Sequence, residues 1–213
     1  AGSHALTLEH APDQLLPRLA ANEEILRQVF QQLSEAVTAG RHVTPASEWL
    51  LDNFHIVEQQ LRQIEDDLPP GYYRHLPKLA DGPLAGYPRV LGLAWAYVAH
   101  TDSLLSEAAL LRFVLAYQTV QPLTIGELWA VAITLRIVLI ENMRRLAVQI
   151  TEGDRVRQAA DALVDQVLEA NGPDVSVHAV LAGLDGAELP EIMAAQVAKR
   201  LRGTDPSETP LAG

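Results

Sequence analysis

Four polar residues whose side chains could hold a metal ion stand at helical spacing within one segment of the chain. They are separated by three, four and three positions, so on a helix they would form one stripe: His55, Glu58, Arg62 and Glu65. A di-metal carboxylate site in a helical bundle needs two Glu-x-x-His motifs from separate helices and two further glutamates. Here the order is His-x-x-Glu and it occurs once, so we expect ion pairs on the flank of a helix and no metal site.

A further carboxylate, Glu127, stands in the most apolar stretch of the chain, residues 125–140. An apolar site would suit a general acid. However, Thr124-Ile125-Gly126-Glu127 also has the pattern of a capping box, in which the glutamate accepts a hydrogen bond from a free amide at the start of a helix. A carboxylate in the first turn also gains from the helix dipole, so we expect a structural role for Glu127.

Arg136 lies in the same apolar stretch and needs a partner wherever it is buried, because arginine stays charged. The carboxylates that we consider as partners are Glu141, Asp102 and Asp81. We expect a structural ion pair that locks an irregular loop onto this helix, with the anchoring of a ligand as the alternative.

Sequence motifs of known catalytic sites are absent. His100-Thr101-Asp102 could supply two members of a Ser-His-Asp arrangement, but no Gly-x-Ser-x-Gly turn offers the nucleophile. The two glycine-rich phosphate loops and the zinc-binding His-Glu-x-x-His motif are also missing. An autonomous glycoside hydrolase would need two carboxylates within about 10 Å of each other across a cleft. The candidate carboxylates are Glu58, Glu127 and Glu141, and a hydrolase of this kind remains an alternative function.

The richest group of candidate binding residues lies in an irregular segment from Pro69 to Arg89, which contains five prolines and three glycines. It concentrates aromatic and basic side chains on an otherwise acidic chain: Tyr72, Tyr73, Arg74, His75, Lys78 and Arg89. Sugars stack on tyrosine rings, and phosphates pair with arginine. We therefore treat these residues and Arg136 as candidate contacts to a ligand or partner. The structural alternative is an ordered loop that fills the gap between helices with its own side chains.

The composition limits the classes of partner. The chain has 213 residues, of which 48% are hydrophobic and 20% charged, and its formal net charge is -11. The negative charge disfavours binding to nucleic acid and to anionic membrane surfaces. The longest apolar stretch, 125–140, is shorter than the roughly 20 residues that a membrane span needs, so we expect no membrane insertion. The chain has no cysteine, which excludes thiolate metal sites, and we expect no cofactor.

The hydrophobic periodicity predicts an all-α fold of about seven to eight helices around a central apolar helix, with one long ordered loop and no strands. The helices are expected at about 13–39, 45–68, 88–101, 106–119, from 125 past 140, from an N-cap at Asp154 to about 168, and at 176–184 and 190–202. We divide the chain into a tag remnant and N-terminal extension (1–10), a helical domain (11–203) and a linker or tail (204–213).

Several strings between Trp49 and Ala147 are long and unusual. They are Leu51-Asp52-Asn53-Phe54-His55-Ile56-Val57-Glu58, Leu68-Pro69-Pro70-Gly71-Tyr72-Tyr73-Arg74-His75-Leu76-Pro77-Lys78-Leu79, Gly86-Tyr87-Pro88-Arg89 and Leu123-Thr124-Ile125-Gly126-Glu127-Leu128-Trp129. In these strings the chain resembles the N-terminal region of the cyclic β-1,2-glucan synthases, which are large bacterial inner-membrane proteins. The resemblance covers about half of the chain strongly.

This resemblance implies a soluble domain at the cytoplasmic face of the inner membrane. It would precede the membrane-spanning segments and a transferase domain that uses UDP-glucose. A transferase needs acidic residues that hold a metal and a base on an α/β domain, so we assign no catalytic residue here. We expect a non-catalytic domain with a scaffolding or regulatory role, whose partners are the remainder of the synthase and either β-glucan or UDP-glucose. The alternative is a domain that binds a sugar or UDP-sugar through the loop residues and Arg136.

Overall fold

The computed structural model describes residues 4–7, 14–68, 71–171 and 191–203. This part of the chain is mostly α-helical, which confirms the all-α class. The sequence predicts no strands, yet two short ones occur. β1 (Leu6–Thr7) pairs antiparallel with β2 (Lys78–Leu79), which lies in the irregular loop. Strands of two residues carry no alternation that sequence reasoning could detect.

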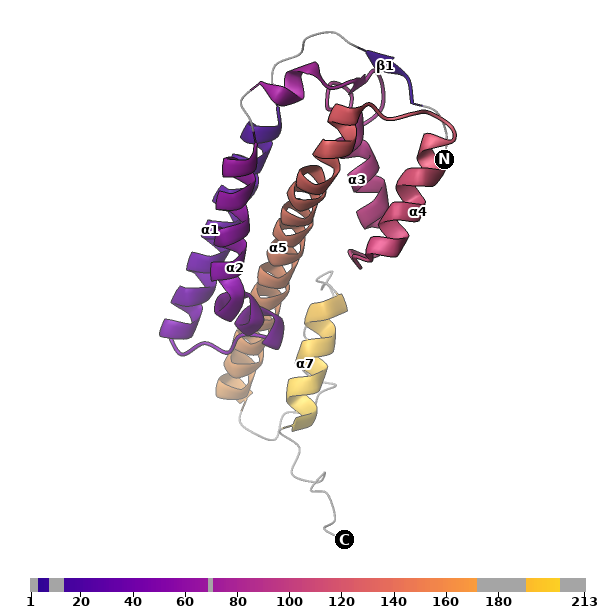
Figure 1. Ribbon diagram of the computed structural model, residues 1–213. Helices are drawn as coiled ribbons and strands as arrows, with labels where there is room; N and C mark the ends of the chain where they lie inside the picture. The colour runs from indigo at the N-terminus through magenta and orange to yellow at the C-terminus, as the bar shows by residue number, and fades with distance from the viewer. Residues whose placement is uncertain (1–3, 8–13, 69–70, 172–190, 204–213) are drawn as a thin grey trace.

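The first two helices form an antiparallel pair on one side of the molecule (Figure 1). They are α1 (Leu15–Thr38) and α2 (Pro45–Asp67), and the rings of Phe30 and Phe54 stack between them at 4.3 Å. α2 begins as predicted, because the Thr44 side chain accepts a hydrogen bond from the Ser47 amide and proline occupies the first helical position.

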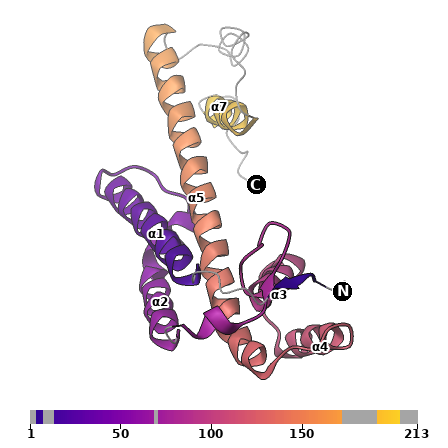
Figure 2. The same ribbon diagram turned by 90° about the horizontal axis from the view of Figure 1, so that it is seen from above.

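α5 (Ile125–Asn171) is a single helix of 47 residues that contacts α1, α2, α3 and α7. Figures 1 and 2 show α1 and α2 on one side of α5 and the remaining helices on the other. The predicted start of a new helix at Asp154 is therefore wrong. Asp154 is buried inside α5 and accepts hydrogen bonds from the Ser47 hydroxyl and the Arg157 guanidinium. Asp154 could cap a helix, but here its carboxylate bonds to Ser47 of the neighbouring helix α2. The preceding Gly153 does not end α5 either, since a glycine inside a helix costs only about 1 kcal/mol.

We predict that Asp154→Ala lowers the free energy of unfolding by about 2 kcal/mol, because it removes the buried carboxylate that accepts hydrogen bonds from the Ser47 and Thr44 hydroxyls. The matched control is Glu152→Ala. Glu152 forms an ion pair with the well-exposed Arg155, and its loss should change stability by no more than about 0.5 kcal/mol. Urea denaturation of both variants measures the difference. Equal losses would show that Asp154 does not tie α2 to α5.

The remaining helices cover the other side of α5. α3 (Arg89–His100) packs directly on α5. α4 (Glu107–Gln118) packs on α3 through the rings of Tyr97 and Phe113, which are 5.6 Å apart. α7 (Glu191–Gly203) packs on the later part of α5. The helix expected at 176–184 and the tail at 204–213 lie outside the described residues.

The loop between α2 and α3 is ordered where the structure describes it. It forms one turn of 3-10 helix, η1 (Tyr72–His75), and then β2. Gly71 precedes η1 with φ +79°, in the left-handed region that favours glycine. Within the described ranges, no helix combines the length and the apolar character that crossing a membrane requires.

Candidate functional site

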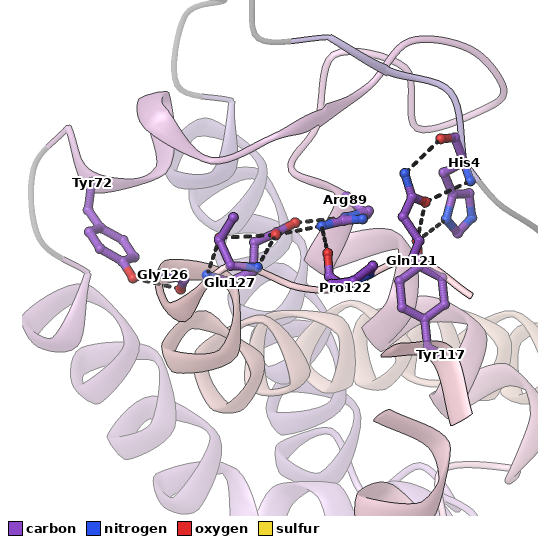
Figure 3. A network of polar contacts seen from close by, with 9 residues as sticks. His4, Tyr72, Arg89, Tyr117, Gln121, Pro122, Gly126 and Glu127 are labelled. Atoms are coloured by element: carbon purple, nitrogen blue, oxygen red, sulfur yellow. Dashed lines mark hydrogen bonds and ion pairs between the residues drawn. The ribbon is translucent and has the colours of Figure 1, made fainter. Parts of the chain in front are cut away.

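The loop is fastened to the first turn of α5 by a buried ion pair between Arg89 and Glu127 (Figure 3). The guanidinium donates two hydrogen bonds to the carboxylate, from Nε at 2.8 Å and from Nη2 at 2.6 Å. Nη2 also donates to the carbonyl oxygen of Pro122. The two side chains are 2% and 0% exposed, so each charge depends on the other for compensation.

Glu127 also completes the predicted capping box. Its carboxylate accepts hydrogen bonds from the amide and the hydroxyl of Thr124, and its own amide donates to the Thr124 hydroxyl. The capping box that the sequence predicts at Thr124–Glu127 is therefore present. Sequence reasoning missed the pairing with Arg89, because the two residues are 38 positions apart and nothing local joins them.

The environment of Arg89 keeps it charged. Burial alone would lower the pKa of Arg89, but the hydrogen bonds and the negative charge of Glu127 outweigh it and hold that pKa above its ordinary value. Since the folded-state pKa is raised, the contribution of Arg89 to stability is fully present below the ordinary arginine pKa. It would be lost only at a pH above that value.

The aromatic and basic loop residues do not form one binding surface. Tyr73 and Lys78 are buried, and the Lys78 ammonium donates to the carbonyl oxygen of Arg74. Tyr72 is partly buried, and its hydroxyl donates to the carbonyl oxygen of Gly126 at 2.6 Å (Figure 3). Arg74 and His75 are exposed. Of the predicted loop contacts, these two offer the most surface to a ligand or partner.

Arg136 points to a different neighbour from those predicted. It donates to Asp67 at the end of α2, at 2.9 Å, and both side chains are well exposed. The predicted partners Glu141, Asp102 and Asp81 are wrong. Glu141 lies five positions further along the helix, which turns it well away from Arg136 around the helix axis, and Arg18 of α1 binds it.

The polar stripe on α2 is a solvated flank. Glu58 forms an ion pair with Arg27 of α1, His55 lies 3.1 Å from the carbonyl oxygen of Asp52, and Arg62 is exposed. No group of three or more histidine, aspartate or glutamate side chains in the described ranges is arranged to hold a metal ion. Each of the three carboxylates considered for hydrolysis, Glu58, Glu127 and Glu141, is in an ion pair with an arginine.

Residues 4–7 also take part in the structure, although they lie in the segment 1–10 that the sequence predicts to be a tag remnant and N-terminal extension. The His4 ring lies 2.8 Å from the Tyr117 hydroxyl, and the His4 backbone exchanges hydrogen bonds with the Gln121 side chain (Figure 3). These contacts join the start of the chain to the end of α4, next to the Arg89–Glu127 pair.

The first turn of α5 presents three large apolar side chains to solvent. Ile125 is 74% exposed, Leu128 is 38% exposed and Trp129 is 80% exposed. We call these three residues the Trp129 face. A single exposed leucine needs no explanation, but adjacent large apolar side chains with tryptophan as the most exposed are typical of a surface that another molecule covers. The Arg89–Glu127 pair and the Tyr72 hydrogen bond hold the turn that carries this face.

A pocket with a volume of about 350 Å³ lies between α3 and α5. Its lining includes Trp95, Asp102, Glu141, Asn142, Arg144 and Arg145. No sequence motif predicts this group, because α3 and α5 contribute their residues from more than 35 positions apart. Of the lining residues, the sequence predicts a role only for Asp102 and Glu141, as partners in a structural ion pair.

The sequence is similar to one curated synthase over most of its length. It is 39% identical over 163 residues, or 76% of the chain, to the cyclic beta-(1,2)-glucan synthase NdvB of Rhizobium meliloti (strain 1021). The chain spans about 6% of the length of that relative. No protein-family model matches the chain.

Proposed function

Since the chain is related to the cyclic β-(1,2)-glucan synthases, as its sequence motifs predict, we propose that it is a non-catalytic helical domain of such a synthase. In this proposal the domain docks onto the remainder of the synthase and has a scaffolding or regulatory role in glucan synthesis. The parent is a UDP-glucose-dependent glycosyltransferase of the inner membrane, and the domain lies on its cytoplasmic face.

The carboxylates support the non-catalytic part of the proposal. A glycoside hydrolase needs two carboxyl groups that face a common cleft, one of them free to give and take a proton. Glu58, Glu127 and Glu141 instead face three different arginines, in ion pairs with closest N···O distances of 2.6 Å. A carboxylate that is held in an ion pair with arginine stabilises the fold and is poorly suited to transfer a proton.

The Trp129 face is the single observation that carries the docking part of the proposal. Tryptophan is the residue type most enriched at the energetic centres of protein interfaces. The occupant that we propose is the remainder of the synthase polypeptide, because about 94% of the matched relative lies outside the matched region (100% minus the 6% that the chain spans). Arg74 and His75 are exposed in η1, the turn whose Tyr72 bonds to α5, and in this proposal they contribute to the polar rim of the interface.

An activity assay with two arms tests the proposed function. The purified chain alone, incubated with UDP-glucose and Mg²⁺, should form no β-1,2-glucan, and it should release no glucose from β-1,2-glucan. Added to a synthase that lacks this region, it should restore part of the lost glucan formation. Glucan formation or hydrolysis by the chain alone would contradict the non-catalytic role. Failure to restore activity, with the chain shown to be folded, would contradict the scaffolding role.

A further inference from the structure

The pocket between α3 and α5 has a built lining that the proposed docking does not use. α3 contributes Trp95, and α5 contributes Glu141, Asn142 and Arg145. Asp102 comes from the turn that follows α3. Its volume of about 350 Å³ is within the range of small-molecule sites, which begins at about 300 Å³. Within this lining the Ser103 hydroxyl accepts a hydrogen bond of 2.6 Å from the Asn142 amide.

One donor in this pocket lacks an acceptor. Arg144 lines the pocket, and its Nε is buried without a hydrogen-bond partner among the described residues. An unsatisfied buried donor is costly, and native structures leave few of them. The other arginines at the pocket are occupied, since Arg145 donates to Asn142 and Arg18, just outside the lining, binds Glu141. That Nε is covered by protein, so a ligand would meet the terminal nitrogens of the Arg144 guanidinium, which also have no acceptor among the described residues.

The aromatic residue of the pocket is held in place. Trp95 is 38% exposed, and the Arg18 guanidinium lies over its ring at 5.7 Å. Arg18 is fixed in turn by two hydrogen bonds of 2.6 Å to Glu141, which raise the pKa of Arg18 above its ordinary value. An aromatic ring that is positioned by its neighbours and remains partly exposed offers a rigid apolar platform to a ligand.

The charges around the pocket nearly cancel. Glu141 is neutralised by Arg18, and the carboxylate of Asp102 opposes the positive charges of Arg144 and Arg145. Since Asn142 is already bonded to Ser103 and Arg145, the lining offers a ligand mainly the donors of Arg144 and the acceptors of the Asp102 carboxylate. A hydroxyl group is both donor and acceptor, so it matches this mixture better than a multiply charged anion does.

We propose that this pocket binds one glucosyl unit of a neutral glucan, with a pyranose face against Trp95 and hydroxyl groups on Arg144 and Asp102. The C–H groups on one face of a pyranose match an aromatic surface, and its ring of hydroxyls matches the mixed polar groups. The lining of the pocket supports the proposal that the ligand is a pyranose. The proposal that the natural ligand is β-1,2-linked rests on the proposed function.

The backbone at Asp102 offers a variant that separates binding from folding. Asp102 and Ser103 have φ values of +48° and +65°, and the Ser103 amide donates to the Val98 carbonyl oxygen in the manner of a helix C-cap where glycine is usual. Asp102→Gly should therefore leave the melting temperature unchanged or raise it by about 2–4 °C. It should nevertheless weaken sugar binding, because it removes a carboxylate from the lining.

Isothermal titration calorimetry of the full chain with β-1,2-linked glucobiose, UDP-glucose and UDP tests the proposal. Glucobiose should bind in a saturable manner, and UDP alone should not bind. Trp95→Ala and Arg144→Gln should each weaken glucobiose binding at least tenfold, and Trp95→Phe should recover part of the loss. The matched controls are Trp49→Ala and Arg112→Gln, which change exposed residues outside the pocket and should leave binding intact.

Three results would overturn the proposal: no glucobiose binding at millimolar concentration, binding that Trp95→Ala and Arg144→Gln leave unchanged in folded proteins, or UDP binding in the pocket as tightly as UDP-glucose. The failure of the proposed function is distinguishable from these results. Trp129→Ala alters the docking face and not the pocket, so it should retain sugar binding whether or not the chain docks onto a synthase.

Discussion

Replacing Glu127 with alanine should lower the free energy of unfolding by about 3–5 kcal/mol, the largest loss that we expect from a single substitution. The substitution strands the buried Arg89 guanidinium without a counter-charge and removes the carboxylate from the capping box at Thr124. A domain of ordinary stability has about 5–15 kcal/mol in total, so the variant should unfold at a much lower urea concentration.

The matched control is Glu58→Ala, which breaks an ion pair on the exposed flank of α1 and α2. Solvent screens that pair, so its loss should cost no more than about 1 kcal/mol. A second comparison replaces both buried charges, in the double variant Arg89→Met and Glu127→Leu. This variant should recover much of the stability, because no uncompensated charge remains. If Glu127→Ala costs no more than Glu58→Ala, the buried pair does not hold the loop to α5.

The second large effect concerns association. Trp129→Ala should weaken the binding of the chain to the remainder of the synthase by about 30-fold or more, which corresponds to a loss of 2 kcal/mol or more. Trp129 is 80% exposed, so the substitution should leave the free energy of unfolding within about 0.5 kcal/mol of the unsubstituted chain. Surface plasmon resonance with the immobilised remainder measures the affinity.

Trp49→Ala is the matched control for this prediction. Trp49 is 55% exposed and lines an apolar groove between α2 and α5. Its substitution therefore tests whether the loss of any exposed tryptophan would weaken binding to the remainder of the synthase. We expect its effect on the affinity to stay below about threefold, since the proposed interface lies at the first turn of α5. A larger loss for Trp49→Ala than for Trp129→Ala would move the interface to that groove and contradict the assignment of the Trp129 face.

Local signals predicted the parts of the fold that depend on neighbouring residues. The Thr44-Pro45 start of α2 depends on two adjacent residues and the Thr124–Glu127 capping box on four, and both occur as expected. Asp154 shows the limit of such signals. An aspartate in an uninterrupted helix has the same local appearance as a helix cap, and only its distant partner Ser47 reveals its role.

Long-range pairing could not be predicted. The sequence contains arginines and carboxylates in numbers that allow many pairs, and the choice of Glu127 for Arg89 or of Asp67 for Arg136 depends on how the helices pack. The α3–α5 pocket was missed for the same reason, because its residues become neighbours only when the two helices lie side by side. The exposure of Trp129 is likewise hidden in sequence, where a tryptophan after a capping box would suit a core helix equally well.

Hydroxyl-radical footprinting of the intact synthase tests the central claim most directly, because it reports whether Trp129 is covered in the protein that the domain would serve. In the isolated chain Trp129 should be oxidised faster than Trp95, in line with their exposed fractions of 80% and 38%. In the intact synthase the rate at Trp129 should fall at least tenfold, while the rate at Trp49 stays within about twofold. An unchanged rate at Trp129 in the intact synthase would contradict docking through this face.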